Sequence, residues 1–218
     1  MTTQAFDPEG ADRAARPGLI RRTWRALTRP AAHVSLGILL LVGAAGGVVF
    51  WGGFNWAMEL TNNEAFCVSC HEMKNNVYAE YQGSVHDANA SGVRATCPDC
   101  HVPKDWIHKV QRKIQASNEV LHWALGSIDT PEKFEGQRLR LATNVWTSMK
   151  ATDSRECRNC HDFQSMDLAQ QGARARPVHM EATAKGQTCI DCHKGVAHSL
   201  PAGTAEAERA LNAKFAHK

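Results

Sequence analysis

Aromatic residues are scarce in this sequence of 218 residues, because Phe, Trp and Tyr together make up only 7% of it. Large aromatic side chains dominate the cores of many domains, so the polypeptide alone has little material for one. Signals for β-strands are scarce as well. These absences favour a mainly α-helical chain with extensive loops, whose core needs apolar material from another source.

Net charge is lacking outside the N-terminal region. The formal net charge is +3, and the first 33 residues already supply it, with six arginines against three acidic residues. The remaining 19 basic and 19 acidic residues cancel. Nothing in the sequence therefore favours a nucleic-acid partner.

No cysteine stands outside a repeated motif. All eight cysteines fall into four Cys-x-x-Cys-His motifs: Cys67, Cys70 and His71; Cys97, Cys100 and His101; Cys157, Cys160 and His161; Cys189, Cys192 and His193. In this spacing two thiols bind the vinyl groups of one haem, and the next residue places an imidazole beneath its iron. The rivals are zinc sites, redox pairs and a disulfide framework, but none of them needs a histidine after every second cysteine. The motifs predict a c-type cytochrome with four covalently bound haem c groups, which would also supply the missing core.

Charge is absent from residues 34–54, which are almost wholly apolar. At about 1.5 Å per residue, such a helix crosses a hydrocarbon layer of roughly 30 Å. Six arginines precede it, so we expect a single span in the bacterial inner membrane, with the N-terminus in the cytoplasm and the haem motifs in the periplasm. A cleaved signal peptide is the alternative, with residues 43–47 as its processing region. Gly43 and Gly47 also suit close helix contact, which predicts a homo-oligomer through the anchor.

The expected organisation has four parts. Residues 1–33 form a basic cytoplasmic segment, residues 34–54 the transmembrane anchor, residues 55–200 a periplasmic tetrahaem domain, and residues 201–218 a C-terminal tail. Within the haem domain, residues 104–125 show helical spacing with a basic flank and Gly126 as C-cap, and a second helix begins near Asp129 or Thr130 with Pro131 in its first turn. Residues 83–92 and 172–186 are expected to be loops.

The haem motifs form two similar pairs, since their starts are separated by 30, 60 and 32 residues. The second motif of each pair is preceded by a glycine and a threonine and contains an aspartate. One lone histidine also lies between the motifs of each pair, His86 in the first and His179 in the second. We infer an internal duplication of a dihaem unit.

Histidines outside the motifs are candidates for the distal iron ligands. Duplication favours His86 and His179, and position favours His198, five residues after the last motif. The others, His33, His108, His122 and His217, are interpreted as surface or packing residues. A thioether can replace an imidazole at iron, so Met73 could compete with His71 in the first motif, although packing is the simpler interpretation.

The sequence resembles the NapC/NirT family of membrane-anchored tetrahaem quinol dehydrogenases, most closely at residues 67–73, 84–86, 97–103 and 188–198. This resemblance implies that His86, His179 and His198 are distal ligands, which gives three bis-histidine haems. It also implies that electrons enter at the first haem, whose distal side is open beside the quinol. In a related branch of the family a methionine matching Met73 takes the iron, so the choice between His71 and Met73 stays open.

The resemblance also implies a quinol site at Lys113 and Glu119, which lie roughly 120° apart on an ideal helix. The hypothesis is that Lys113 donates a hydrogen bond to a quinol oxygen and Glu119 accepts a proton. The substrate would be menaquinol or ubiquinol. The electrons would pass to a periplasmic reductase or to its small cytochrome subunit. Nitrate reductase is the first candidate for this recipient, and nitrite or other reductases come next. A terminal reductase is disfavoured because all four motifs end in histidine. A passive haem conduit without a quinol site remains the alternative.

Overall fold

The computed structural model describes residues 18–28 and 33–216. Its contacts divide the chain into two compact units, residues 1–52 and residues 53–218. All regular elements within the described ranges are helical, as the sequence predicts.

The first unit contains α1 (Leu19–Thr28) and most of α2 (Leu36–Leu60). An 18-residue window of α2 has a mean hydropathy of 2.0, and α2 is long enough and apolar enough to cross a membrane. The predicted spanning helix is therefore present, but it begins at Leu36 and continues past Phe54 to Leu60. Trp56, Met58 and Glu59 are all compatible with a helix, so the helix outlasts the strictly apolar run.

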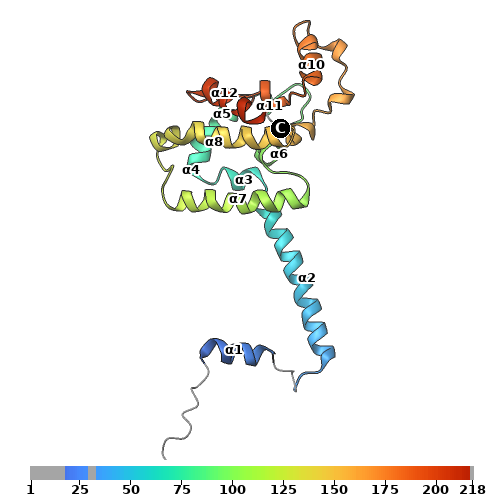
Figure 1. The fold of residues 1–218 in the computed structure, drawn as a ribbon, viewed down its shortest axis with the longest axis vertical. Coiled ribbons are helices and arrows are strands. Elements are labelled where there is room, and N and C mark those ends of the chain that lie inside the picture. Colours follow the sequence, from blue (N-terminus) through green and yellow to red (C-terminus); the bar gives the residue numbers. More distant parts are fainter. Residues whose placement is uncertain (1–17, 29–32, 217–218) are drawn as a thin grey trace, which may run out of the picture. The chain divides into compact units, whose positions relative to one another are not determined.

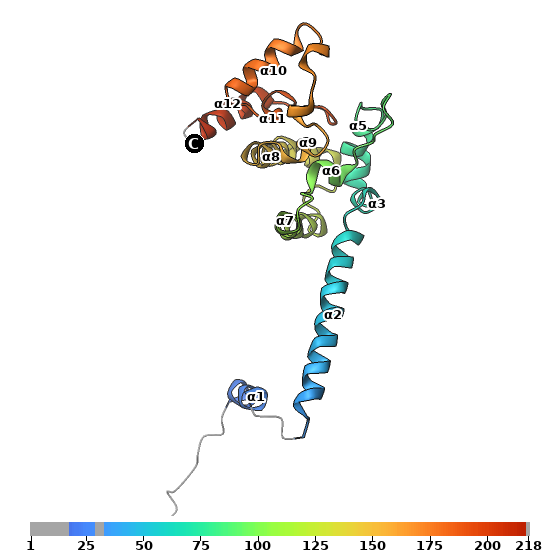
Figure 2. The ribbon, with the colours of Figure 1, turned by 90° about the vertical axis from the view of Figure 1, so that its right-hand side faces the viewer.

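The second unit is built from two long helices and many short ones (Figures 1 and 2). The long helices are α7 (Trp106–Ala124) and α8 (Pro131–Ala151), which run alongside each other in both views. The short elements are α3 (Glu64–Cys67), α4 (His71–Met73), the π-helix η1 (Lys74–Tyr78), α5 (Ala79–Tyr81), α6 (Cys97–His101), α9 (Arg155–Arg158), η2 (Phe163–Ser165), η3 (Leu168–Gln170), α10 (Ala175–Ala184), α11 (Cys189–Cys192) and α12 (Thr204–Phe215).

Local signals fix the ends of the two long helices. The Asp105 side chain caps α7 by accepting from the backbone N–H of His108 at 3.0 Å, and Gly126 follows α7 with a φ of +64°. Thr130 caps α8 in the same way through the N–H of Lys133. The sequence predicts both helices, the first from helical spacing and Gly126 and the second from Thr130 and Pro131, and both predictions are confirmed, although α7 begins at Trp106 behind its Asp105 cap.

One predicted loop is wrong. Residues 83–92 contain no helix, as expected, but residues 172–186 contain α10. The two glycines mark only the ends of this segment. Pro177 lies in the first turn, where a missing N–H costs nothing, and the turns that follow are rich in good helix formers such as Met180 and Glu181.

The apolar core of the second unit is small. Trp146, Ile190 and Leu211 form its buried centre, and only six apolar side chains are buried among the described residues. Leu211 belongs to α12, inside the segment 201–218 that the sequence predicts only as a tail. Gly203 allows this packing, because it has a φ of +82° and a Cβ there would lie 2.9 Å from Leu139.

Candidate functional site

The four haem motifs lie on short helices, with α3 ending at Cys67 and α6, α9 and α11 carrying the other three. All eight cysteines are free thiols. The described residues also contain no cluster of three or more His, Cys, Asp or Glu side chains that could hold a metal ion. The structure therefore gives no support to a disulfide framework or a zinc site, and the thiols are available for thioether bonds.

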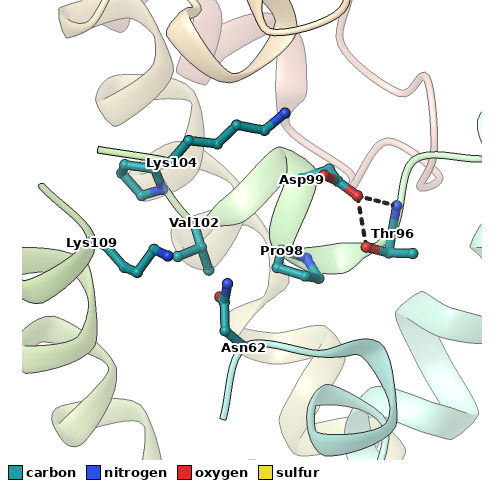
Figure 3. A pocket seen from close by; sticks show the side chains of 8 residues that line it. Asn62, Thr96, Pro98, Asp99, Val102, Lys104 and Lys109 are labelled. Carbon is teal, nitrogen blue, oxygen red and sulfur yellow. Dashed lines mark hydrogen bonds between the residues drawn. The ribbon is translucent and has the colours of Figure 1, made fainter. Parts of the chain in front are cut away.

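The second motif of each pair has the same local structure. Thr96 and Thr188 are the N-cap residues of α6 and α11, and each donates its backbone N–H to an aspartate three residues later, at 2.9 Å in both cases. Figure 3 shows this contact between Thr96 and Asp99. The glycines that precede the two caps, Gly92 and Gly186, both have positive φ. The threonine and aspartate shared by the two sequence copies therefore make the same capping box.

Three motif histidines face three histidines from outside the motifs. The ring centres lie 6.3 Å apart for His86 and His161, 6.3 Å for His101 and His198, and 5.9 Å for His179 and His193. Two imidazoles on opposite sides of one metal ion, with metal–nitrogen bonds of about 2 Å, have ring centres about 6 Å apart. The spacing of all three pairs fits a haem iron between the two rings.

The environment of these rings also suits iron coordination. Burial, together with the nearby charges of His198 and Arg112, lowers the pKa of His101 to about 4, and burial lowers the pKa of His198 as well. Both rings are therefore biased towards the neutral form that coordinates metals. The Nδ1 atoms of His86 and His198 are buried without a hydrogen-bond partner, which is unusual for a buried imidazole that has no metal to bind.

The histidine pairing departs from the duplication. A strict repeat would place His86 opposite His101, just as His179 lies opposite His193. Instead His86 faces His161 of the third motif, and His198 crosses over to His101 of the second. The two motif pairs are thus interlocked, since each supplies one histidine ring that faces a motif histidine of the other.

The first motif is different from the other three. His71 is an exposed residue, and its Nε2 lies 3.2 Å from the carbonyl oxygen of Asp129. Met73 is half-buried on the same short helix, next to the π-helix η1. Glu72 between them is buried, and its Oε2 atom has no hydrogen-bond partner. A π-helix and a buried carboxylate are both frequent at functional sites, and sequence reasoning missed both.

The motifs form a continuous series in space. Helix α3 of the first motif contacts α6 of the second, and α6 contacts α9 of the third. Cys100 is also within electrostatic reach of Cys160, and Cys157 is within reach of Cys189. Each motif therefore neighbours the next in the order of the sequence.

Lys113 and Glu119 have separate partners on α7. The Nζ atom of Lys113 donates to the carbonyl oxygen of Thr61 at 2.6 Å and to its hydroxyl at 3.1 Å. Burial lowers the pKa of Lys113, and the electrostatic influence of Cys67 in the first motif opposes this change. Glu119 pairs instead with Arg112 at 2.9 Å. Lys113 is thus within electrostatic reach of the first motif, while Glu119 is held on another side of the helix.

A cavity of about 270 Å³ lies beside the second motif (Figure 3). Neither Lys113 nor Glu119 lines it, so it does not coincide with the predicted quinol site. Its lining residues are Asn62, Thr96, Pro98, Asp99, Val102, Pro103, Lys104 and Lys109.

His198 is held in place by a pair of charged residues that sequence reasoning did not single out. Arg138 on α8 donates to Glu80 at 2.5 Å and to the carbonyl oxygen of Ser199 at 2.9 Å. Glu80 also accepts from the backbone N–H of Ser199 at 2.9 Å. Three segments far apart in the sequence therefore fix the residue next to His198. No pattern of neighbouring residues in the sequence predicts such contacts.

Replacing Arg138 by methionine is expected to loosen His198 and to turn one low-spin haem partly high-spin, without loss of haem. Electron paramagnetic resonance of the oxidised protein measures this change. Arg140→Met is the matched control, because Arg140 on the same helix bonds only to the neighbouring Gln137. An unchanged low-spin spectrum for Arg138→Met would show that the Arg138–Glu80 pair has no influence on His198 as an iron ligand.

Comparison with known proteins gives a consistent result. The model of the "NapC/NirT cytochrome c family, N-terminal region" matches residues 29–203. The chain is 56% identical to "Cytochrome c-type protein NapC" of Escherichia coli K12 over 85% of its own length and 92% of the relative. It is 57% identical to "Denitrification system component NirT" of Stutzerimonas stutzeri, over 83% and 90%. It is also 50% identical to a "Putative tetraheme cytochrome-c type" protein of Allochromatium vinosum, over 77% and 89%.

No solved structure matches the chain. The family model covers most of the sequence, including all four haem motifs and the apolar helix. With its Cys-x-x-Cys-His motifs and its facing histidine pairs, this chain belongs to the NapC/NirT family of electron-transferring c-type cytochromes.

Proposed function

We propose that this protein is a membrane-anchored tetrahaem cytochrome that oxidises membrane quinol and passes the electrons to a periplasmic reductase. One observation carries the proposal: within the described part of the chain three motifs have a facing histidine, whereas the first has none there and has a half-buried lysine within electrostatic reach. Such asymmetry suits three electron carriers and one site where a substrate approaches.

The cysteine pairs of the four motifs would hold one haem c each. His101 with His198, His161 with His86, and His193 with His179 would ligate three irons, and His71 or Met73 the first. Bound haem supplies one-electron redox chemistry. The chain's own part is to fix each ring at the spacing already described and to keep the rings of His101 and His198 neutral by burial.

At the quinol, Lys113 would donate a hydrogen bond to a ring oxygen and hold that oxygen beside the first motif. Thr61 orients the lysine by accepting two of its hydrogen bonds. Glu119 would accept a proton, for which it must give up its ion pair with Arg112. Menaquinol and ubiquinol both carry the required oxygens.

Electrons would then follow the motifs in sequence order. The recipient is a periplasmic nitrate reductase or its small cytochrome subunit. A nitrite-handling reductase is the alternative, supported by the relative named as a component of a denitrification system. The anchor would lie in the bacterial inner membrane, with the haem domain in the periplasm and Gly43 and Gly47 in a helix contact between copies.

The decisive test uses the purified, haem-loaded protein in detergent with a reduced quinol analogue. Rapid reduction of all four haems, counted by the absorbance of their pyridine complexes, is the expected result. Reduction by dithionite but not by quinol would instead identify a passive conduit. A count other than four haems would contradict the cofactor assignment.

A further inference from the structure

Helix α7 carries a stripe of large aliphatic side chains that no other part of the described chain covers. Ile107, Ile114 and Leu121 recur every seven residues, and Leu125 follows at the C-cap. Their exposed fractions are 63%, 68%, 54% and 68%. A continuous exposed aliphatic face of this length is uncommon on a domain surrounded by water.

The stripe points away from the contacts that hold α7 to its domain. Arg112 donates to the carbonyl oxygen of His101 at 3.2 Å. At about 100° per residue, Arg112 lies roughly opposite Ile114 and Leu121 around the helix axis. The haem motif is thus on one side of α7, and the aliphatic stripe is on the other.

The first half of α7 is fastened to residues that directly follow the apolar run of α2. Trp106 donates to Asn55 at 3.0 Å, Lys109 to Glu59 at 2.6 Å, and Lys113 to Thr61. These partners occupy the end of the candidate membrane span and the turn after it. A helix fastened there begins at the level where lipid headgroups meet water.

We propose that α7 lies in the membrane–water interface, with Ile107, Ile114, Leu121 and Leu125 in contact with lipid acyl chains. An amphipathic helix in this setting buries its apolar face at the boundary between headgroups and acyl chains. Its polar side, with His108 and Gln115, faces water. The bonds from α7 to Asn55, Glu59 and Thr61 place the stripe at the end of the candidate membrane span, which argues for lipid rather than a soluble partner as its occupant.

The lipid contact does not depend on quinol chemistry, but it bears on the proposed function. Lys113 lies about 100° around the helix from Ile114. If Lys113 binds quinol as proposed, the substrate reaches it sideways from the bilayer without crossing water.

Photo-crosslinking of the full-length, haem-loaded protein tests the interfacial position. Benzoylphenylalanine replaces Ile114 or Leu121 in one set, and His108 or Gln115, which lie at least about 100° around the helix from both, in the control set, in liposomes of phosphatidylethanolamine and phosphatidylglycerol. After illumination, mass spectrometry of the α7 peptides measures phospholipid adducts. We expect on the order of tenfold more adduct at positions 114 and 121 than at the control positions.

Three outcomes would overturn the proposal. Equal lipid adducts at all four positions would show that α7 has no preferred face towards the bilayer. Crosslinks from positions 114 and 121 to a haem of the same chain would show that the stripe covers a cofactor. Crosslinks to a second copy would make it a protein interface. Haem absorbance in every variant verifies folding, and the result is independent of quinol turnover.

Discussion

Replacing Lys113 by leucine is expected to slow quinol-dependent haem reduction by roughly 10- to 100-fold while the haem content stays the same. An ammonium group has three donors, and Thr61 takes two of them. The third is free to reach a quinol oxygen, and a hydrogen bond from a charged donor is worth about 1.5–3 kcal/mol. Stopped-flow absorbance with a reduced quinol analogue gives the rate per haem.

Lys109→Leu is the matched control for this substitution. Lys109 lies one turn earlier on α7 and binds Glu59 rather than Thr61, so most of the quinol rate should survive its loss. Two results would contradict this role. Lys113→Leu could reduce its haems as fast as the unmodified protein, or both variants could be slowed equally. Either result would show that Lys113 does not bind the quinol.

The pH dependence adds a second signature. Because burial lowers the pKa of Lys113, the protonated donor is lost as pH rises through a value below the ordinary range for lysine. The rate of quinol oxidation should therefore decrease with rising pH, and this decrease should begin at a lower pH than the deprotonation of an exposed lysine would produce. Lys113→Arg keeps its charge across this range, so whatever activity it retains should not show that fall.

Features encoded within a few residues could be predicted from the sequence. The Cys-x-x-Cys-His motifs, the apolar run of α2 and the caps of α7 and α8 all depend on neighbours in the chain. The prediction of a loop at residues 172–186 was also based on local features, but it was wrong. It gave the two terminal glycines more weight than the helix formers between them.

Features that join distant segments could not be predicted. Duplication favours His86 as an iron ligand, but only the three-dimensional structure places it opposite His161 rather than His101. Nothing in the sequence indicates that Thr61 accepts a hydrogen bond from Lys113, which lies 52 positions later. The Arg138 and Glu80 contact likewise spans 58 positions. Such pairs follow from the packing of the whole domain, and no local periodicity reports them.

Removing the ring of His86, His179 or His198 by substitution with alanine is expected to turn one low-spin haem high-spin in each case. Covalent attachment is expected to persist, because the cysteines and the motif histidine are untouched. Electron paramagnetic resonance of the oxidised protein counts the change. The ring planes of His86 and His161 are nearly perpendicular, at 81°, whereas the other two pairs differ by 25° and 33°. Perpendicular ligand planes give the more anisotropic low-spin signal, so His86→Ala should remove that signal and leave the two rhombic ones.

A double substitution decides which haem His86 serves. Replacing Cys157 and Cys160 by alanine removes the haem of the third motif. If His86 binds that iron, adding His86→Ala to this background creates no further high-spin haem, because the two changes act on one site. If His86 binds the second haem, as a strict repeat requires, the combined variant gains one. His179→Ala in the same background should still produce its own high-spin haem, which verifies that the remaining sites are assembled. A gain from His86→Ala in that background would disprove the interlocked arrangement of the two haem pairs.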